Sequence, residues 1–487
     1  MSTTYPTNEA AVARASVPLC VDLDGSLIRT DILWEQLAVL LKRKPWSLLL
    51  IVVWMLRGRS YLKHRLASQV SLRVETLPYR EDVTEFLRAA RAAGRRIALV
   101  TASNEAVARD VAAHSGLFDE VYGSTAELNL KGARKAEFLC QKFGEHGFEY
   151  LGDSEADLPV WRAAKGAYVV GPRNLVLKAQ RAGSVLGHFE SSSVSIATYL
   201  RSLRIHHWSK NLLVFLPVLL AHRIAWRPWQ EVALGFLLFG TCASGMYILN
   251  DLLDLHSDRQ HPYKKKRPFA AGELPLWVGI LEALVLVPGS LILSAVVAPK
   301  LALVLLAYSA MTILYSWQIK KVVLLDTFLL SGFYTFRIWA GGLVSDTPLS
   351  GWFMGFSVFF FLSLAMAKRS SELMHASQLV EEGHSGRGYH VGDRDILAMI
   401  GIASCFAAAV VLVLYTQSPE IHALYLAPQR LILLCPIVVY WLSRVWLMAS
   451  RGELKADPVQ FALRDRTSWI LAAVAVCVLL LSNLQIR

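Results

Sequence analysis

The sequence predicts two parts of different fold class, an N-terminal α/β domain with a parallel sheet and an all-α membrane domain after it. Residues 1–200 have the composition of a water-soluble domain. Residues 211–487 are dominated by apolar runs of about 18–22 residues, the length that crosses a bilayer. The whole chain of 487 residues is 54% hydrophobic, above the share that is usual for soluble domains.

Three apolar stretches that end in polar residues predict parallel strands within residues 1–175. They are VPLCVDLDGS (17–26), RRIALVTAS (95–103) and FEYLGDSEAD (148–157), with helical stretches between them. Side chains at the carboxyl ends of parallel strands meet in one crevice. The polar residues placed there are Asp22, Asp24, Thr101, Ser103, Asp153 and Asp157. Residues 30–90 are expected to form a small helical cap, and residues 176–200 a linker.

The order DxDGS, threonine-ended strand, GDSxxD resembles the haloacid dehalogenase (HAD) phosphatases. The resemblance implies that Asp22 attacks phosphorus to form an aspartyl phosphate. Asp24 would protonate the leaving alcohol and then activate water. Thr101, Ser103 and a lysine would hold the phosphoryl group, and Lys135 is preferred to Lys131 for that lysine. The implied Mg²⁺ ligands are Asp22, Asp24 through its carbonyl, Asp153 and Asp157. A catalytically silent domain that serves as a scaffold remains an alternative.

The stretch WSLLLIVVWML (46–56) inside the expected cap is apolar but too short to span a bilayer. Three interpretations stay open. The helix lies in the membrane interface, lines a pocket for a lipid-linked substrate, or is a plain buried helix of the cap.

Apolar runs in the second part predict about nine membrane helices, within residues 201–487. They lie at 211–225, 231–249, 276–297, 300–319, 322–344, 351–367, 396–417, 429–448 and 467–485. Lysine and arginine gather in the loops of one side, which predicts a cytoplasmic N-terminal domain, a cytoplasmic 250–275 loop and a C-terminus outside. The N-terminus lacks the apolar core of a secretory signal, and the six scattered cysteines are expected to stay reduced.

The loop NDLLDLHSDRQHPYKKKRPFAAGELP (250–275) is the most unusual feature of this part. On a helix, Asp251, Asp254 and Asp258 share one face. Hard carboxylate oxygens suit Mg²⁺ that bridges to a diphosphate, and the following cations suit its outer phosphates. A solvated positive-inside loop explains the lysines but not the one-sided acids at a membrane border. The net charge of +12 therefore indicates anionic lipids or phosphorylated substrates, and no nucleic acid.

The motif NDxxDxxxD with the continuation DRxHPxKxxRPxAxG resembles the UbiA superfamily of intramembrane transferases. Within it, RIHHWSKNLLVF (204–215), YSWQIKKVVLLDTFLLSGFYTFRIWAGG (315–342) and AKRSSEL (367–373) resemble decaprenyl-phosphate phosphoribosyltransferases. The resemblance implies Mg²⁺-assisted attack of a polyprenyl phosphate on C1 of phosphoribosyl pyrophosphate (PRPP). The implied metal and diphosphate ligands are Asn250, Asp251, Asp254 and Asp258, with Lys264, Lys266 and Arg267 on donor phosphates.

Other charges in this part are weaker candidates for substrate binding. Lys210, beside Asn211, would hold a lipid or donor phosphate, or is a lysine that snorkels to the interface. Asp326 would bind ribose or metal and Arg337 the lipid phosphate, unless they serve structural Asp–Arg interactions with neighbouring helices. Further candidates at the same mouth are Tyr315, Lys320, Lys368 and Arg369.

The stretch MAKRSSELMHAS (366–377) distinguishes two donors. Aromatic-acceptor prenyltransferases generally carry a second aspartate-rich motif at this place, whereas this chain has only Glu372. The difference disfavours a prenyl diphosphate donor.

Together these patterns predict a bifunctional membrane enzyme that makes polyprenyl-phosphoryl ribose, a cell-wall arabinan precursor, and that could assemble as a homo-oligomer. The HAD domain would remove the 5-phosphate. One alternative is an aromatic prenyltransferase with a HAD domain that is regulatory or acts on another phosphate ester. A transporter is disfavoured because the carboxylates lie at the membrane edge and not at its midplane.

Overall fold

The structure is a computed structural model that describes residues 16–125, 128–191, 194–222, 225–379, 388–454 and 458–483. The chain divides into two compact units. The first consists of Met1–Leu203 and Tyr247–Ala283, and the second of Arg204–Met246 and Leu284–Arg487. The aspartate-rich loop therefore belongs to the same unit as the N-terminal domain.

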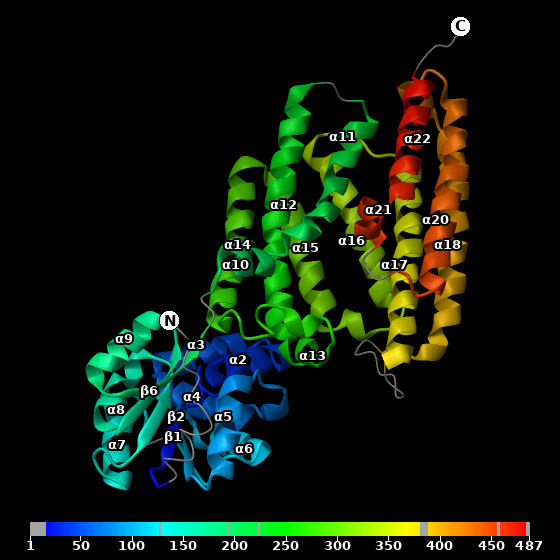
Figure 1. The fold of residues 1–487 in the computed structure, drawn as a ribbon. Coiled ribbons are helices and arrows are strands. Elements are labelled where there is room, and N and C mark those ends of the chain that lie inside the picture. The colour runs from blue at the N-terminus through cyan, green and yellow to red at the C-terminus, as the bar shows by residue number, and fades with distance from the viewer. Residues whose placement is uncertain are drawn as a thin grey trace. The chain divides into compact units, whose positions relative to one another are not determined.

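The N-terminal domain is built on a six-stranded, wholly parallel sheet in the order β3-β2-β1-β4-β5-β6 (Figure 1). Leu19 and Val21 of β1 enter one hydrophobic core and Cys20 enters another, so both faces of the sheet are covered. This confirms the predicted α/β class. The strands are β1 (Leu19–Val21), β2 (Ile97–Asn104), β3 (Glu120–Ser124), β4 (Glu149–Gly152), β5 (Gly166–Gly171) and β6 (Val185–Glu190).

The linker predicted at residues 176–200 begins too early. Residues of α9 (Arg173–Ala182) and β6 occupy its first half, and β6 pairs with β5 in the sheet. The sequence of β6, VLGHFE, is short and mixes polar with apolar residues, because an edge strand is only half covered. Ser192 and Ser193 of the predicted linker lie outside the described residues.

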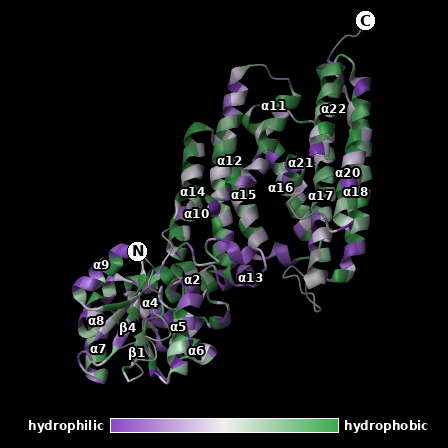
Figure 2. Cartoon of the chain, in the orientation of Figure 1, coloured by the Kyte–Doolittle hydropathy of each residue, from purple (hydrophilic) through white to green (hydrophobic). Residues whose placement is uncertain are grey.

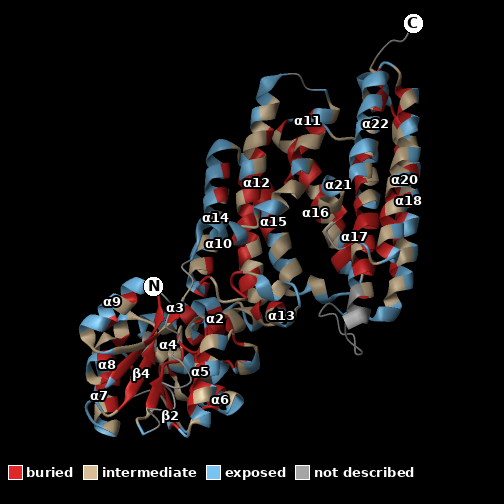
Figure 3. Cartoon of the chain, viewed as in Figure 1, coloured by how far each residue is buried: buried red, intermediate tan, exposed pale blue. Residues whose placement is uncertain are grey.

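The helices expected for the cap are present between β1 and β2. They are α2 (Ile32–Arg43), α3 (Ser47–Leu56) and α4 (Arg59–Gln69), followed by α5 (Glu81–Ala92), with α6 (Glu105–Ser115), α7 (Ala133–Phe143) and α8 (Leu158–Ala163) later in the domain. Helix α3 is not buried within the protein as one interpretation required. Leu49 and Leu56 are 76% and 83% exposed, and Ser47 and Ile51 are its buried positions. Figure 2 shows many hydrophobic residues along the long helices, and Figure 3 shows the strands of the sheet largely buried.

Among the described residues, six helices are long and apolar enough to cross a membrane, or up to seven if a bent pair forms one span. They include α12 (Trp226–Leu253), α14 (Leu276–Val297), α15 (Pro299–Trp317), α17 (Gly351–Leu379), α18 (Arg394–Thr416) and α20 (Leu434–Ser450). The bent pair is α21 (Pro458–Arg464) with α22 (Arg466–Ser482), at 85°. A further helix, α16 (Leu325–Val344), is 20 residues long and coincides with the fifth predicted span.

The prediction of nine spans is therefore not matched in number among the described residues. The first predicted span, 211–225, is instead a 3₁₀ segment (Ile205–Phe215) followed by the five-residue helix α11 (Leu216–Leu220). Pro217 stands at the start of α11, where its missing N–H interrupts a continuous helix. The 3₁₀ segment packs closely on α16, since a Cβ added to Gly341 would lie 2.0 Å from the Val214 carbonyl oxygen.

Candidate active sites

A compact carboxylate cluster lies at the carboxyl ends of the central strands. Asp22 follows β1, Asp153 follows β4, and Asp157 ends the 3₁₀ turn Glu155–Asp157. One oxygen of each carboxylate lies within 4.8 Å of the others. Because β1 and β4 are adjacent parallel strands, residues that follow them meet at one edge of the sheet. Three hard oxygen ligands fit Mg²⁺, so this cluster could hold the ion that the HAD resemblance implies.

Lys135 of α7 completes the cluster. Its Nζ donates to Asp22 Oδ1 at 2.9 Å and to the Tyr150 hydroxyl at 2.7 Å, and it lies 3.8 Å from Asp157 Oδ1. Burial lowers the pKa of Lys135, but the neighbouring carboxylates of Asp22 and Asp157 outweigh burial and raise it above its ordinary value. Lys135 is therefore a fixed cation beside the expected nucleophile. Lys131, the alternative, is exposed.

Tyr150 is a member of this site that the sequence did not reveal. Its hydroxyl accepts from Lys135 and donates to Asp157 Oδ1 at 3.0 Å, so it connects the amine to the third carboxylate. Its position in β4, two residues before Gly152, looks in sequence like an ordinary core tyrosine.

Asp24 faces hydroxyl and amide donors and stands apart from the compact cluster. Ser103 Oγ donates to Oδ2 at 2.6 Å, and the Ile32 amide donates to Oδ1 at 2.9 Å. Thr101 lies buried nearby, and its Oγ1 accepts from the Ser103 amide at 3.0 Å. These are the residue types that the sequence predicted at the strand ends, and the structure brings them together.

The two aspartates of DxDG have raised and unequal pKa values. Burial raises the pKa of Asp22 to about 6, against the opposing effect of Lys135. Burial, assisted by Asp31, raises the pKa of Asp24 to about 7. Between pH 6 and 7 the carboxyl of Asp22 is therefore more ionised than that of Asp24, the direction of difference that a nucleophile and a general acid require.

Gly25, between these aspartates and Ser26, is required by geometry. Its φ is +77°, and an added Cβ would lie 2.0 Å from Asp153 Oδ2. Ser26 Oγ donates to Asp153 Oδ1 at 3.3 Å. The glycine thus lets the chain turn closely against Asp153 at the end of β4.

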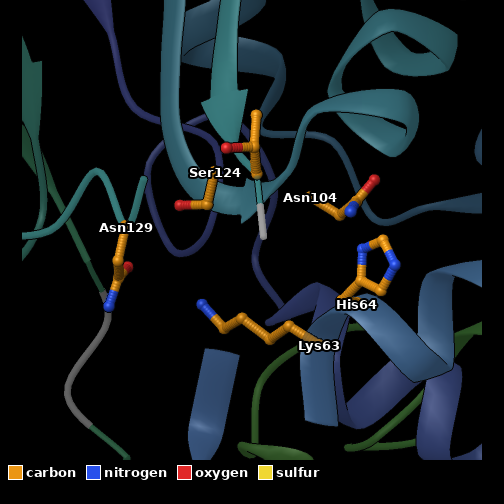
Figure 4. A pocket seen from close by; sticks show the side chains of 6 residues that line it. Lys63, His64, Asn104, Ser124 and Asn129 are labelled. Carbon is orange, nitrogen blue, oxygen red and sulfur yellow. The ribbon is translucent and has the colours of Figure 1, made fainter. Parts of the chain in front are cut away.

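The cap touches the core beside the carboxyl end of β2. Lys63 and His64 of α4 face Asn104, Ser124 and Asn129 across a cavity of about 10 Å³, room for about one water molecule (Figure 4). Lys63 Nζ also donates to the Ala102 carbonyl at 2.8 Å, between Thr101 and Ser103. The cap is therefore closed on this strand end in the structure.

The aspartate-rich loop departs slightly from the continuous helix that the sequence suggested. Helix α12 ends at Leu253, and Asp254 has non-helical backbone angles before α13 (Leu255–Gln260) begins. The Asp254 amide still donates to the Asn250 carbonyl at 2.9 Å, and the Asp258 amide donates to the Asp254 carbonyl at the same distance. The three aspartates thus stay on successive turns across a bend.

Cations of the chain itself lie against these carboxylates. Arg267 Nη1 lies 3.1 Å from Asp251 Oδ1 and 2.5 Å from Asp258 Oδ2, both buried side chains. Lys42 Nζ lies 3.0 Å from Asp254 Oδ1. Each of the three loop carboxylates is thus paired with a cation of the chain, and among the described residues their oxygens do not gather within 4.8 Å of one another as those of the HAD cluster do. Arg267 was expected on donor phosphates, and here it contacts carboxylates.

In the second unit, Asp326 of α16 is fully buried and paired. It accepts hydrogen bonds from Arg369 of α17 and from the Tyr389 hydroxyl. Tyr389 also accepts from the Leu324 amide at 2.9 Å and lies under the Arg369 guanidinium, 5.4 Å from the ring centroid. These contacts favour the structural interpretation of Asp326, with Arg369 as its partner.

Arg337 lies in a separate polar and aromatic environment. Its Nε donates to Asn211 Oδ1 at 2.8 Å and Nη1 donates to the Phe333 carbonyl at 2.6 Å. The guanidinium stands 5.2 and 5.3 Å from the ring centroids of Phe239 and Tyr308. Asn211 is thus a partner of Arg337.

The remaining candidates of the second unit, Lys210, Tyr315, Lys320 and Lys368, are all partly buried. Lys210 Nζ lies 5.6 Å from the ring centroid of Tyr334, and the ring of Tyr315 packs edge-on against Phe333 at 5.8 Å. Lys320 lies in the 3₁₀ turn Ile319–Lys321, and Lys368 precedes Arg369 on α17. Lys264 and Lys266 of the first unit form another 3₁₀ turn, Lys264–Lys266.

The profile of the UbiA prenyltransferase family matches residues 211–464, more than half of the chain. The chain belongs to the UbiA prenyltransferase family. A second profile, that of the haloacid dehalogenase-like hydrolases, matches residues 19–162 of this UbiA-family protein. The protein is therefore an integral membrane enzyme with an N-terminal HAD domain.

Relatives of this UbiA-family chain include proteins with and without a stated activity. An uncharacterized protein y4nM of Sinorhizobium fredii is 40% identical over 463 residues, 94% of this chain and 89% of that protein. The nodulation protein NoeC of Azorhizobium caulinodans is 34% identical over 58% of this chain and 91% of its own. The decaprenyl-phosphate phosphoribosyltransferase of Mycobacterium tuberculosis is 34% identical over 183 residues, 37% of this chain and 61% of that protein.

A similar solved structure is that of a UbiA homolog from Archaeoglobus fulgidus bound to DMAPP and Mg²⁺. It is 17% identical, has a TM-score of 0.45, and the match covers 58% of this chain and 99% of that one.

Proposed function

We propose that this enzyme transfers 5-phosphoribose from PRPP to a polyprenyl phosphate and that its HAD domain then removes the 5-phosphate. The product is polyprenyl-phosphoryl ribose, a precursor of lipid-linked arabinose for cell-wall polymers. The observation that carries the proposal is the loop 250–275, in which the carboxylates of Asp251, Asp254 and Asp258 lie against cations. The likeness of the chain to decaprenyl-phosphate phosphoribosyltransferases supports the same donor and acceptor.

In the transferase step, the loop residues hold the leaving diphosphate. Asn250, Asp251, Asp254 and Asp258 would hold Mg²⁺, which when bound neutralises charge on the departing pyrophosphate. The basic run Lys264–Arg267 adds positive charge that acts most strongly as the C1–O bond breaks and negative charge grows on the diphosphate. An anionic lipid phosphate is already a nucleophile, so this step needs no general base.

Residues of the second unit are proposed for the acceptor. Lys210 is placed on the lipid phosphate, with Tyr315, Lys320 and Lys368 at the same mouth. Arg337 is a weaker candidate, because Asn211 and the Phe333 carbonyl already hold its guanidinium. Asp326 and Arg369 are assigned to each other and not to substrate.

In the phosphatase step, Asp22 attacks phosphorus while the bond from phosphorus to ribose O5 breaks. Asp24 gives its proton to O5 and later takes a proton from the water that cleaves the aspartyl phosphate, which releases inorganic phosphate. Lys135 and Thr101 hold the phosphoryl oxygens. Mg²⁺ held by Asp22, Asp153 and Asp157 would screen the repulsion between carboxylate and phosphate.

The distribution of positive loops supports a cytoplasmic position for the HAD domain, the 250–275 loop and both reactions, with the C-terminus outside. Residues 484–487, at that terminus, lie outside the described residues. An intermediate made at this face then meets the tethered phosphatase at a high local concentration.

The test is incubation of the detergent-purified chain with Mg²⁺, PRPP and a polyprenyl phosphate, followed by mass analysis of the lipids. Polyprenyl-phosphoryl ribose without the 5-phosphate is expected from the unmutated chain. The phosphorylated lipid should accumulate with Asp22→Asn, and neither lipid should form with Asp251→Asn.

Two results contradict the proposal. Accumulation of the phosphorylated lipid by the unmutated chain would separate the HAD domain from this product. Absence of any ribosylated lipid, together with turnover of a prenyl diphosphate and an aromatic acceptor, would assign the chain to prenyl-transfer chemistry.

A further inference from the structure

Helix α2 of the HAD domain contacts the aspartate-rich loop at two points within the first unit. Arg259 donates to the Glu35 carboxylate through Nη1 at 3.1 Å and Nη2 at 2.6 Å. Lys42 Nζ lies 3.0 Å from Asp254 Oδ1. Residues 35 and 42 lie two turns apart on one face of α2, and their partners Arg259 and Asp254 run in the opposite chain direction. The two attachments therefore align α2 antiparallel to α13.

The two ion pairs differ sharply in burial. The side chains of Glu35 and Arg259 are 0% and 6% exposed, and Thr30 Oγ1 also donates to Glu35 at 2.8 Å. The side chains of Lys42 and Asp254 are 37% and 14% exposed. The buried two-pronged pair fixes the helix on the loop, whereas a partly exposed lysine pair adds little to that docking. The Glu35–Arg259 pair therefore holds α2, and with it Lys42, beside the loop.

Lys42 is well suited to bind a phosphate oxygen beside Asp254. Its ammonium has three rotatable donors on a flexible stem, so it can turn from a carboxylate to a neighbouring phosphate without movement of α2. Asp254 belongs to the set assigned above to the magnesium-bound diphosphate. A cation at this point raises the positive charge that faces the leaving group.

We infer that Lys42 is a substrate-binding residue of the transferase site that the HAD domain supplies, and that its ligand is the diphosphate group of the donor. The inference rests on the proposed function. The same helix begins at the HAD site, where the Ile32 amide donates to Asp24 Oδ1 at 2.9 Å. Ten residues of helix separate Ile32 from Lys42, about 15 Å. One short helix thus contributes to both reactions.

The experiment measures binding of inorganic pyrophosphate with Mg²⁺ to the full chain by calorimetry. All variants carry Asp22→Asn, which removes hydrolysis of the probe. Lys42→Ala is expected to weaken binding about tenfold or more, the effect of losing a charge-assisted hydrogen bond. Lys42→Arg should retain most of the affinity because it keeps the charge. Lys44→Ala, an exposed lysine just beyond α2, is the matched control and should bind as the parent does.

The outcomes separate this inference from the function on which it rests. Unchanged binding in Lys42→Ala, or tighter binding because the lysine competes with Mg²⁺, would overturn the role of Lys42 alone. Asp251→Asn should abolish the binding in every background. If the parent fails to bind magnesium pyrophosphate, or if Asp251→Asn does not reduce binding, the proposed diphosphate site itself is wrong.

Discussion

Lys135 Nζ donates to Asp22 Oδ1 at 2.9 Å and to the Tyr150 hydroxyl at 2.7 Å, within a buried site at the carboxyl edge of the sheet. The lysine therefore fixes the position of the expected nucleophile and keeps positive charge where a phosphoryl group would arrive. The Tyr150 hydroxyl in turn donates to Asp157 Oδ1 and so fixes the position of that carboxylate. Asp22, Lys135, Tyr150 and Asp157 are thus joined in one hydrogen-bonded network.

The hydrolysis of a soluble phosphomonoester should show a narrow pH optimum. The rate should rise as Asp22, with a pKa of about 6, ionises, and fall as Asp24, with a pKa of about 7, loses the proton it must donate. Bound Mg²⁺ favours ionised Asp22, so saturating metal should move the acid limb to lower pH. The measurement is kcat/KM of the full chain between pH 5 and 9 at fixed Mg²⁺.

Asp24→Asn should reduce this rate by about 10²–10⁴-fold and flatten the alkaline limb. Asp110→Asn, an exposed aspartate on α6, is the control and should leave the profile unchanged. An alkaline limb that survives in Asp24→Asn would show that another group supplies the proton.

Removal of Mg²⁺ should destabilise the sheet edge more at high pH than at low pH. Burial raises the pKa values of Asp22, Asp24 and Asp153, so the folded state binds protons that the unfolded state has released. Their contribution to stability therefore falls as pH rises from about 4, the unfolded value, to about 7 and beyond. Hydrogen exchange of peptides 19–24 and 149–157, with and without EDTA at pH 5.5 and 8, measures the effect. Equal protection at the two pH values in EDTA would refute it.

Glu35→Gln should destabilise the first unit substantially. The change leaves the Arg259 guanidinium buried without its carboxylate, and breaking a buried pair costs about 3–5 kcal/mol. Pulse proteolysis in denaturant, read at sites within the first unit, gives the free energy. Glu105→Gln on α6 is the control, because its partner Arg109 is 69% exposed and such surface pairs contribute less than about 1 kcal/mol. Equal effects of the two changes would contradict the anchoring role of Glu35.

Asp326→Asn should destabilise the second unit, because Arg369 is buried and loses an ionic partner. Arg369 keeps Glu372 as a second, more exposed partner, so the loss should stay below about 3–5 kcal/mol, and the double variant Asp326→Asn/Arg369→Met should recover part of it. Thermal inactivation of the purified proteins gives the order of stability of the parent chain, Asp326→Asn and the double variant. A double variant that is no more stable than Asp326→Asn would contradict the unpaired charge of Arg369 as the cause of the loss.

The sheet and its site were predictable because they depend on local patterns. Asp22, Asp153 and Thr101 each stand at the end of an apolar strand. Because parallel strands bring their carboxyl ends together, their closeness could be predicted. The positions of β6 and of the first membrane segment were not predictable in this way. An edge strand lacks a clean period, and Pro217 interrupts an apolar run whose composition alone looks like a span.

The partners of charged residues were the least predictable feature. Asp326 and Arg337 lie 11 residues apart on one helix, yet Asp326 pairs with Arg369 and Arg337 with Asn211. Lys42 and Glu35 carry no motif, and their partners are more than 200 positions away in the chain. Long-range pairing is decided by how elements pack, and a single sequence does not encode that packing in any local pattern.

The discontinuous first unit also limits how this protein can be divided. A cut after residue 203 would separate α2 from residues 247–283, so Glu35 and Arg259 would each lose the partner that covers it. Each fragment would expose a surface that the other covers in the full chain. The smaller fragment would also carry the exposed apolar helix α3, which favours aggregation. The HAD domain and the transferase domain therefore cannot be exchanged independently of each other. A chimera in which either domain comes from a homologue would have to take α2 and the aspartate-rich loop from the same protein.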